Sequence, residues 1–305
     1  MTTMIALVGE QTVPNVLPIR HYHSDSVIFI YSERTEQVYE RMKVVLQKEA
    51  NIDGFKVEPY NIENAAQAIE EEIIKRVENQ SLIFNLTGGT KTMVIAAYQV
   101  AEKRKAPIIY VESEGGRSNI DLYEWKTSNL VHQLNEPILK YLSLHEILDL
   151  SLGRGKDIKG KFHWYQKEPN PQDGSGHIFE IAILQAVRDY EKYEVMGGVK
   201  GRNNQVDIDV MVGYRSQMGL IEAKLGSRGL EGVKQLSTAK LYLKGTYNKQ
   251  FLVLNNKPSK DQEMMCEALD ITIISLLHYQ ENMNALTQED SNTLLTEINK
   301  VMKVG

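Results

Sequence analysis

LIFNLTGGTKT, residues 82–92, joins an apolar run, a pair of glycines and the start of an amphipathic segment. The apolar run is typical of a buried strand, and the segment from about Lys91 predicts a helix. Paired glycines let a backbone approach a ligand closely, and a helix N-terminus presents unpaired N–H groups to an anion. The stretch therefore predicts a strand, an anion-binding loop and a helix.

The same alternation of strand and helix patterns runs through the first half of the chain. Apolar runs predict buried strands at residues 5–8, 27–31, 82–86 and 108–111. Apolar residues at three- and four-residue intervals predict amphipathic helices over residues 36–50 and 64–77. Residues 120–125 and 130–134 could form a terminal hairpin or an interface element, and periodicity does not separate the two. This order predicts an α/β domain with a parallel sheet over residues 1–140.

The pattern changes in the second half of the chain. Glycines and prolines interrupt it over residues 141–174, where we expect a linker. Beyond the linker, the sequence predicts a helix at 177–190, strands at 195–198, 206–212 and 218–223, a helix at 230–243 and a strand at 251–254. This αβββαβ order is mixed rather than doubly wound, and it predicts a second domain over residues 175–305. Within that domain, residues 287–304 have the periodicity of a covering helix.

Composition limits the class of protein. With 305 residues, of which 42% are hydrophobic, the chain is long enough for two ordinary cores. It lacks an apolar run of the length that a membrane helix needs, which favours a soluble protein without a membrane partner. The single cysteine, Cys266, excludes an intramolecular disulfide and a cysteine-cluster zinc site, so the cytoplasm is the expected location.

Charge is unevenly divided between the two halves. Residues 1–150 carry 15 Lys and Arg against 21 Asp and Glu, whereas residues 151–305 carry 20 against 19. The second half is therefore better suited to meet a polyanion. A solvated linker is the favoured interpretation of one basic cluster there, with a phosphate contact as the alternative. Nearby Trp164 and Tyr165 could stack on bases or pack in a core or interface. The cluster, opposed only by Asp157, consists of Arg154, Lys156, Lys159, Lys161 and Lys167.

The residues most informative about chemistry are Asp207 and Asp209 in one predicted strand and Glu222 and Lys224 in the next. Side chains two residues apart point to the same face of a strand, so each pair shares a face. Carboxylate oxygens suit Mg²⁺ or Mn²⁺, which accept phosphate oxygens as further ligands. Phosphodiester hydrolysis needs an activated water and a counter-charge at phosphorus, and a metal ion with Lys224 can supply both. In isolation, Glu222 and Lys224 would be interpreted as an exposed cross-strand pair.

Two further residues make this pattern more specific: Glu180 in the predicted helix at 177–190 and Gln235 in the predicted helix at 230–243. With Asp209, and with Glu222-Ala223-Lys224 thirteen residues later, they resemble the PD-(D/E)xK restriction-endonuclease-like superfamily over about residues 175–255. The resemblance implies a metal-dependent endonuclease acting on DNA or RNA. It also implies that Glu180, Asp209 and Glu222 bind the metal, with Lys224 and Gln235 completing the catalytic set. Which of Asp207 and Asp209 is the ligand stays open.

Polar loops follow three of the predicted strands of the first half, at residues 9–15, 32–35 and 85–92. In an open parallel sheet, ligands bind outside the carboxyl ends of the strands, so these loops should converge on one crevice. The last loop lacks the upstream glycine and the Gly-Lys-Thr order of a Walker A loop, which argues against ATP hydrolysis. Each polar residue alone is typical of a turn or a helix cap. Their convergence favours a ligand site.

The Thr-Gly-Gly-Thr-Lys loop and the loop after the first strand resemble those of the CARF domains of type III CRISPR ancillary proteins, over about residues 1–135. The resemblance implies a Rossmann-like domain that binds a cyclic oligoadenylate, expected to be cyclic tetra-adenylate, across a homodimer. The expected function is a nuclease of antiviral defence activated by this ligand. The alternatives are a non-catalytic sensing regulator and an enzyme that degrades the cyclic ligand. The resemblance implies ten pocket residues: Thr12, Pro14, Asn15, Ser32, Asn85, Thr87, Gly88, Gly89, Thr90 and Lys91.

Overall fold

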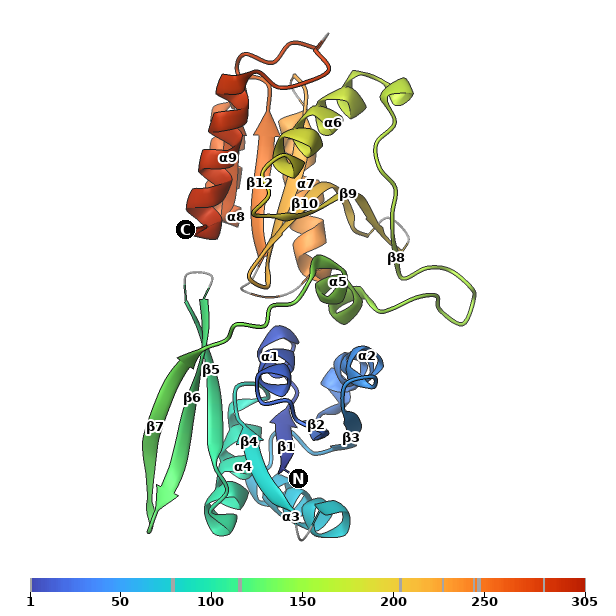
Figure 1. Cartoon of the computed structure of the whole chain (residues 1–305). Helices are drawn as coiled ribbons and strands as arrows, with labels where there is room; N and C mark the ends of the chain where they lie inside the picture. Colours follow the sequence, from blue (N-terminus) through green and yellow to red (C-terminus); the bar gives the residue numbers. More distant parts are fainter. Residues whose placement is uncertain are drawn as a thin grey trace. The chain divides into compact units, whose positions relative to one another are not determined.

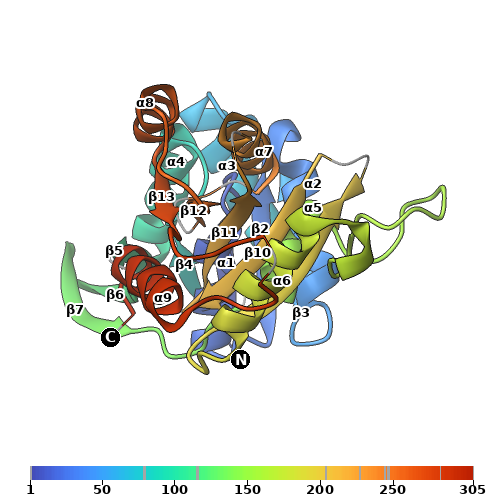
Figure 2. The same ribbon diagram turned by 90° about the horizontal axis from the view of Figure 1, so that it is seen from above.

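The computed structural model describes residues 2–77, 80–114, 117–202, 205–226, 228–243, 245, 248–281 and 283–304. The chain divides into two compact units, each built around its own sheet (Figures 1 and 2). The first unit comprises Met1–Leu142 and Asp149–Ser151, and the second comprises Ser143–Leu148 and Leu152–Gly305. The α/β architecture expected from the sequence is present in both.

The sheet of the first unit has the strand order β3-β2-β1-β4-β5-β6-β7. Strands β1 to β5 run parallel, and β6 and β7 extend the sheet as an antiparallel hairpin. This hairpin is the first of the two arrangements considered for residues 120–125 and 130–134. Because the chain order reverses between β1 and β4, the loops after these strands meet at the carboxyl edge of the sheet. The strands are β1 (Thr2–Leu7), β2 (Ser26–Tyr31), β3 (Asn51–Lys56), β4 (Ser81–Asn85), β5 (Ile108–Glu114), β6 (Arg117–Lys126) and β7 (Asn129–Pro137).

Helices of the first unit follow its parallel strands. They are α1 (Val13–His21), α2 (Glu36–Leu46), α3 (Ile62–Val77) and α4 (Lys91–Arg104). Helices α3 and α4 pack together and share one core with Ile5 and Phe84 of the central strands. Ile69 and Ile73 of α3 are fully buried in that core, and each such side chain contributes about 1.5–3 kcal/mol to stability. The apolar spacing that predicts these helices therefore identifies the side they bury.

The sequence does not predict α1 or β3. Helix α1 contains Pro14 in its first turn and Pro18 in its interior, where proline usually interrupts a helix. Strand β3 contains Asp53 and Gly54, both residue types that are depleted in strands. A Cβ atom on Gly54 would lie 2.7 Å from the Tyr39 ring and 2.9 Å from the Phe29 carbonyl oxygen. Glycine is therefore the residue that lets β3 pack against α2.

The sheet of the second unit has the strand order β13-β12-β11-β10-β9-β8. Neighbours from β8 to β11 are antiparallel, and neighbours from β11 to β13 are parallel. The predicted catalytic strands β10 and β11 are therefore central. The strands are β8 (Trp164–Gln166), β9 (Glu194–Gly201), β10 (Asp207–Tyr214), β11 (Gln217–Lys224), β12 (Asn248–Leu254) and β13 (Ile271–Ser275).

Helices cover the second sheet on both faces (Figure 2). Helices α6 (Ser175–Arg188) and α9 (Gln288–Met302) share a core with Ile221 and Phe251. On the opposite face lies α7 (Gly229–Tyr242), where Gly232 approaches Glu222 closely. Helix α8 (Lys260–Leu269), which contacts α7 and β13, buries Cys266. The sequence predicts α9 but neither α8 nor β13.

Residues 141–174, expected as a linker, contain α5 (Leu144–Leu152) and β8. Strand β8 is three residues long and pairs with β9 at the edge of the second sheet, so it is too short to show a period in the sequence. Helix α5 buries Leu144 and Leu148. No described helix combines the length and the apolar run that crossing a bilayer requires.

Candidate functional site

The predicted catalytic residues meet at a cavity of about 210 Å³ in the second unit. Glu180 of α6, Asp209 of β10, Lys224 of β11 and Gln235 of α7 line this cavity. Glu222 of β11 has no exposed surface and forms an ion pair with Lys224. The structure therefore brings all five residues together from two helices and two strands.

Strand register fixes the centre of this cluster. Strands β10 and β11 are antiparallel, and their register places Asp209 opposite Glu222. The Oδ2 atom of Asp209 accepts a hydrogen bond from the Ala223 backbone N–H at 2.8 Å and lies 3.7 Å from Lys224 Nζ. The same Nζ atom pairs with Glu222 Oε1. One ammonium group thus bridges two carboxylates from neighbouring strands.

Burial dominates the electrostatics of the cluster. Desolvation, reinforced by the nearby charge of Asp209, raises the pKa of Glu180 to about 8. It also raises the pKa of Asp209, against the opposing effect of Lys224, and raises the pKa of Glu222 well above its usual range. Although burial alone would lower the pKa of the Lys224 ammonium, Glu222 and Asp209 raise it. Lys224 therefore stays protonated among carboxyl groups that ionise with difficulty.

Asp207 and Asp209 share a face of β10 but have different partners. Asp207 lies opposite Lys200 of β9, whose Nζ atom donates to both of its carboxylate oxygens at 2.8 and 2.9 Å. Asp209 instead faces Glu222 and Lys224. The sequence does not reveal this division because it depends on which residue of β9 pairs with β10. Lys200 also lines the cavity and is absent from the predicted set.

Donor chemistry at this site suits a hard divalent cation. Glu222 Oε2 and Gln235 Oε1 are buried without a hydrogen-bond partner. Three carboxyl groups share one ammonium group and ionise with difficulty, and a divalent cation would supply the positive charge that favours their ionised forms. With side chains as they stand, no described group of three or more carboxylate, histidine or cysteine side chains is arranged as a metal site. Lys224 Nζ lies against Asp209 and Glu222, and it neutralises the same oxygens that a metal ion would contact.

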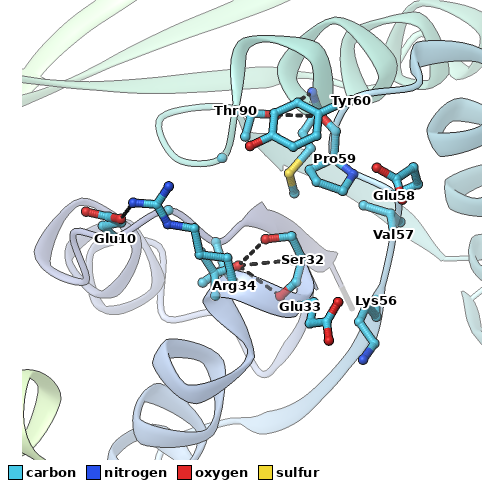
Figure 3. A pocket seen from close by; sticks show the side chains of 15 residues that line it. Glu10, Ser32, Glu33, Arg34, Lys56, Val57, Glu58, Pro59, Tyr60 and Thr90 are labelled. Atoms are coloured by element: carbon cyan, nitrogen blue, oxygen red, sulfur yellow. Dashed lines mark hydrogen bonds and ion pairs between the residues drawn. The ribbon is translucent and has the colours of Figure 1, made fainter.

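A larger cavity of about 890 Å³ lies at the carboxyl edge of the first sheet. Of the predicted pocket residues, Ser32, Gly89 and Thr90 line it (Figure 3). Thr90 caps α4 by accepting a hydrogen bond from the Met93 backbone N–H at 3.2 Å, and its hydroxyl group donates to the Pro59 carbonyl oxygen at 2.9 Å. The glycine loop and the loop after β3 are therefore joined at the cavity wall.

Charged side chains around this cavity include several that the sequence does not single out. Arg34 forms an ion pair with Glu10 on one side, and Lys56, Glu58 and Tyr60 lie across from them (Figure 3). The last three belong to β3 and the loop that follows it. Because β3 is not recognisable from its residue types, its loop does not enter the predicted site.

Other predicted pocket residues brace the loops instead of lining the cavity. Asn85 and Asn15 are fully buried, and Asn85 Nδ2 donates to the Pro14 carbonyl oxygen at 3.3 Å. Asn85 Oδ1 accepts hydrogen bonds from the backbone N–H and the hydroxyl group of Thr87, at 3.0 and 2.7 Å. Three more residues have other places in the fold: Thr12 is the N-cap residue of α1, Gly88 packs on the end of β1, and Lys91 is exposed at the start of α4.

A Cβ atom on Gly88 would lie 2.1 Å from the Leu7 carbonyl oxygen, so only glycine fits where the loop crosses the end of β1. Gly89 adopts a φ of +80°, a conformation that other residues rarely adopt. The two glycines of the loop are therefore required by close approach and by backbone conformation, respectively.

Comparisons with known proteins agree with this architecture. The family model described as the Card1 CARF domain matches residues 3–146. No curated protein matches the sequence. Can2 from Sulfobacillus thermosulfidooxidans, solved in complex with cyclic tetra-adenylate, has a similar fold, with a TM-score of 0.68, 17% identity and 99% coverage of each chain.

Two further solved structures have a similar fold. Protein VC1899 from Vibrio cholerae has a TM-score of 0.70 at 13% identity, over 99% of this chain and 98% of that one. A type III CRISPR defence DNA nuclease activated by cyclic oligoadenylate has a TM-score of 0.62 at 15% identity, over 99% of this chain and 52% of that one. At these identities the likeness concerns the fold. Through the family match over residues 3–146, the first unit of this chain is a CARF domain of the Card1 type.

Proposed function

We propose that this protein is a metal-dependent nuclease of type III CRISPR defence, activated by a cyclic oligoadenylate bound to its CARF domain. The observation that carries the proposal is the Asp209, Glu222 and Lys224 cluster in the same chain as that domain. Buried carboxylates clustered around a cation cost stability and are usually kept for function. The whole-chain likeness in fold to Can2 and to a nuclease activated by cyclic oligoadenylate supports the same conclusion.

In this proposal, Glu180, Asp209 and Glu222 would hold Mg²⁺ or Mn²⁺, which activates water and polarises a phosphoryl oxygen when bound. Lys224 donates to a phosphate oxygen beside those carboxylates and stabilises the negative charge that develops at phosphorus. Gln235, whose Oε1 atom is buried without a partner, holds the scissile strand against α7. Either DNA or RNA satisfies this chemistry.

For the activator we propose cyclic tetra-adenylate, bound at the carboxyl edge of the first sheet. The backbone N–H groups at the start of α4 and the cations Arg34 and Lys56 suit its phosphates. A ring with two-fold symmetry fits a homodimer in which each protomer contributes one CARF domain. The ligand activates by binding the active arrangement more tightly than the inactive one.

The test is an incubation matrix of single- and double-stranded DNA and RNA, with Mn²⁺, Mg²⁺ or EDTA, and with or without cyclic tetra-adenylate. We expect strand scission that requires both metal and cyclic ligand. In Lys224→Ala we expect cleavage to fall by at least about 100-fold with unchanged affinity for cyclic tetra-adenylate. Lys300→Ala, at an exposed position of α9, is the matched control and should cleave normally.

Three outcomes contradict the proposal in different ways. Absence of scission with any metal favours the non-catalytic regulator. Full cleavage by Lys224→Ala removes Lys224 from the mechanism. Conversion of cyclic tetra-adenylate to linear products without scission of other substrates favours the ligand-degrading alternative.

A further inference from the structure

Residues 154–162, here named the basic arm, form an ordered loop between α5 and β8 in the second unit. Lys156 and Phe162 form an antiparallel bridge across its base. The Asp157 backbone N–H donates to the Lys161 carbonyl oxygen at 2.8 Å, and Asp157 Oδ1 accepts from the backbone N–H groups of Lys159 and Lys161 at 2.8 and 2.9 Å. The arm is therefore shaped by its own hydrogen bonds, although most of its residues are exposed to solvent as in a solvated linker.

The acidic residue of the arm is neutralised within the protein. Asp157 Oδ2 lies 2.8 Å from Arg202 Nη2, and the Asp157 side chain is 7% exposed. Lys159 and Lys161 are exposed, and neither forms an ion pair with another described residue. The carboxylate that opposes the lysines in the sequence is thus turned inward in the fold. The outer surface of the arm is positively charged as a result.

An apolar side chain projects from the same tip. Ile158 is fully exposed, although isoleucine is among the residues most often buried in folded proteins. Phe162 is half exposed, and the Lys156 ammonium lies 4.6 Å from its ring centroid. Apolar side chains flanked by cations are the combination with which proteins insert between bases while holding the phosphates.

The strand that follows connects the arm to the catalytic cavity. Tyr165 of β8 lies opposite Lys200 of β9, and Lys200 lies opposite Asp207 of β10. Opposite residues in antiparallel strands share a face, with Cβ atoms about 5 Å apart. Tyr165, which is 42% exposed, is therefore two strands from Asp207, and Asp209 is two residues further along β10. An exposed aromatic ring and a cation thus mark a path from the arm to the carboxylates.

We propose that the basic arm binds the nucleic acid substrate as a single strand, with Ile158 inserted between neighbouring bases and Lys159 and Lys161 on the flanking phosphates. The strand then crosses Tyr165 and Lys200 to reach the catalytic carboxylates. This inference rests on the proposed nuclease function, for which it names the substrate contact. Single strands are favoured because their bases are free to stack on the exposed ring of Tyr165 and to pack against the apolar side chain of Ile158.

The experiment separates binding from cleavage. The full-length protein with cyclic tetra-adenylate is titrated in EDTA against a fluorescein-labelled single-stranded DNA of about 20 nucleotides, and against RNA of the same length, by fluorescence anisotropy. For Lys159→Ala/Lys161→Ala we expect about tenfold weaker binding, with the slope of log K against log salt reduced by about 1.4. For Ile158→Ser we expect about fivefold weaker binding at an unchanged slope.

The matched control is Lys300→Ala/Lys303→Ala, which changes the last turn of α9 and the C-cap residue that follows it. There, Met302 packs beside Gly219 near the start of β11, away from Lys224 at the end of that strand. It removes the same charge and should bind as the wild type does. Equal loss in both double variants, or wild-type protein that binds neither oligonucleotide, overturns the proposal. Tighter binding of a duplex than of a single strand overturns the single-strand assignment. If binding depends on the arm as expected but no metal-dependent scission occurs, the substrate-binding role of the arm is supported and only the nuclease function is refuted.

Discussion

Glu180 is the residue at which the electrostatic cost of the proposed catalytic cluster is most readily measured. Its carboxyl group shares the cavity with Asp209 and Lys224, and burial with the Asp209 charge raises its pKa to about 8. A carboxyl group that keeps its proton in the folded protein loses it in the unfolded chain at much lower pH. The folded state therefore loses stability as the pH rises from the unfolded value of 4.5 toward 8.

We predict that Glu180→Gln removes this loss in the metal-free protein. In EDTA at pH 8, its melting temperature should exceed that of the wild type by roughly 5 °C, corresponding to about 2 kcal/mol. At pH 4.5 the difference should nearly vanish, because Glu180 is then protonated in the folded state and about half protonated in the unfolded chain. Thermal unfolding followed by circular dichroism across this pH range is the measurement. The exposed Glu267→Gln serves as control, and a Glu180→Gln gain that is equal at both pH values would contradict the assignment.

Some residues of this cluster can be predicted from the sequence and others cannot. Asp209, Glu222 and Lys224 are predictable because strand alternation and the Glu-x-Lys spacing are local properties. The separation of Asp207 from Asp209 is not local, because it is set by Lys200 on a neighbouring strand. Pairing between residues of different strands therefore cannot be predicted from residue spacing within one segment.

Prediction of strands and helices from the sequence has the same limit. Strands β1, β2, β4 and β5 each contain a continuous apolar run and are predicted correctly within a few residues, whereas β3 is not recognised. Its Asp53 and Gly54 follow from its place at the sheet edge and from the packing of Tyr39. The end of β3 supplies Lys56 and the loop after it supplies Tyr60 to the larger cavity. Because the strand is not recognised, these residues are missing from the predicted site.

The turn between β4 and α4 supports a prediction about stability. Gly88→Ala should destabilise the first unit by about 2 kcal/mol, because its Cβ atom would lie 2.1 Å from the Leu7 carbonyl oxygen and the backbone must shift. Thermal unfolding should show a melting temperature lower by roughly 5 °C. Gly176→Ala is the control, since its Cβ atom would meet only Arg228 Nη2, at 3.7 Å. Unchanged melting of Gly88→Ala would show that the loop tolerates a side chain there.

At the scale of the whole molecule, each unit has its own buried core. One core joins α3 and α4 to the parallel sheet, and the other joins α6 and α9 to the mixed sheet. We therefore predict two transitions in differential scanning calorimetry. Gly88→Ala should lower only one of them, because Gly88 packs entirely within the first unit.

The same two transitions identify where the activator binds. At about 100 times its Kd, cyclic tetra-adenylate should stabilise the transition that Gly88→Ala lowers by about 2.7 kcal/mol and leave the other in place. A shift confined to the other transition would assign the ligand to the second unit and contradict the proposed CARF pocket.

The lone cysteine has a practical consequence. Cys266 is 1% exposed on α8, and burial raises the pKa of its thiol, so a maleimide reagent meets little reactive thiolate in the native chain. A cysteine introduced at a fully exposed site such as Ile158 becomes the readily labelled thiol without removal of Cys266. Pairs of spin labels attached to such cysteines, in an otherwise unaltered protein, would report the proposed activation as a change in the distance between the two labels.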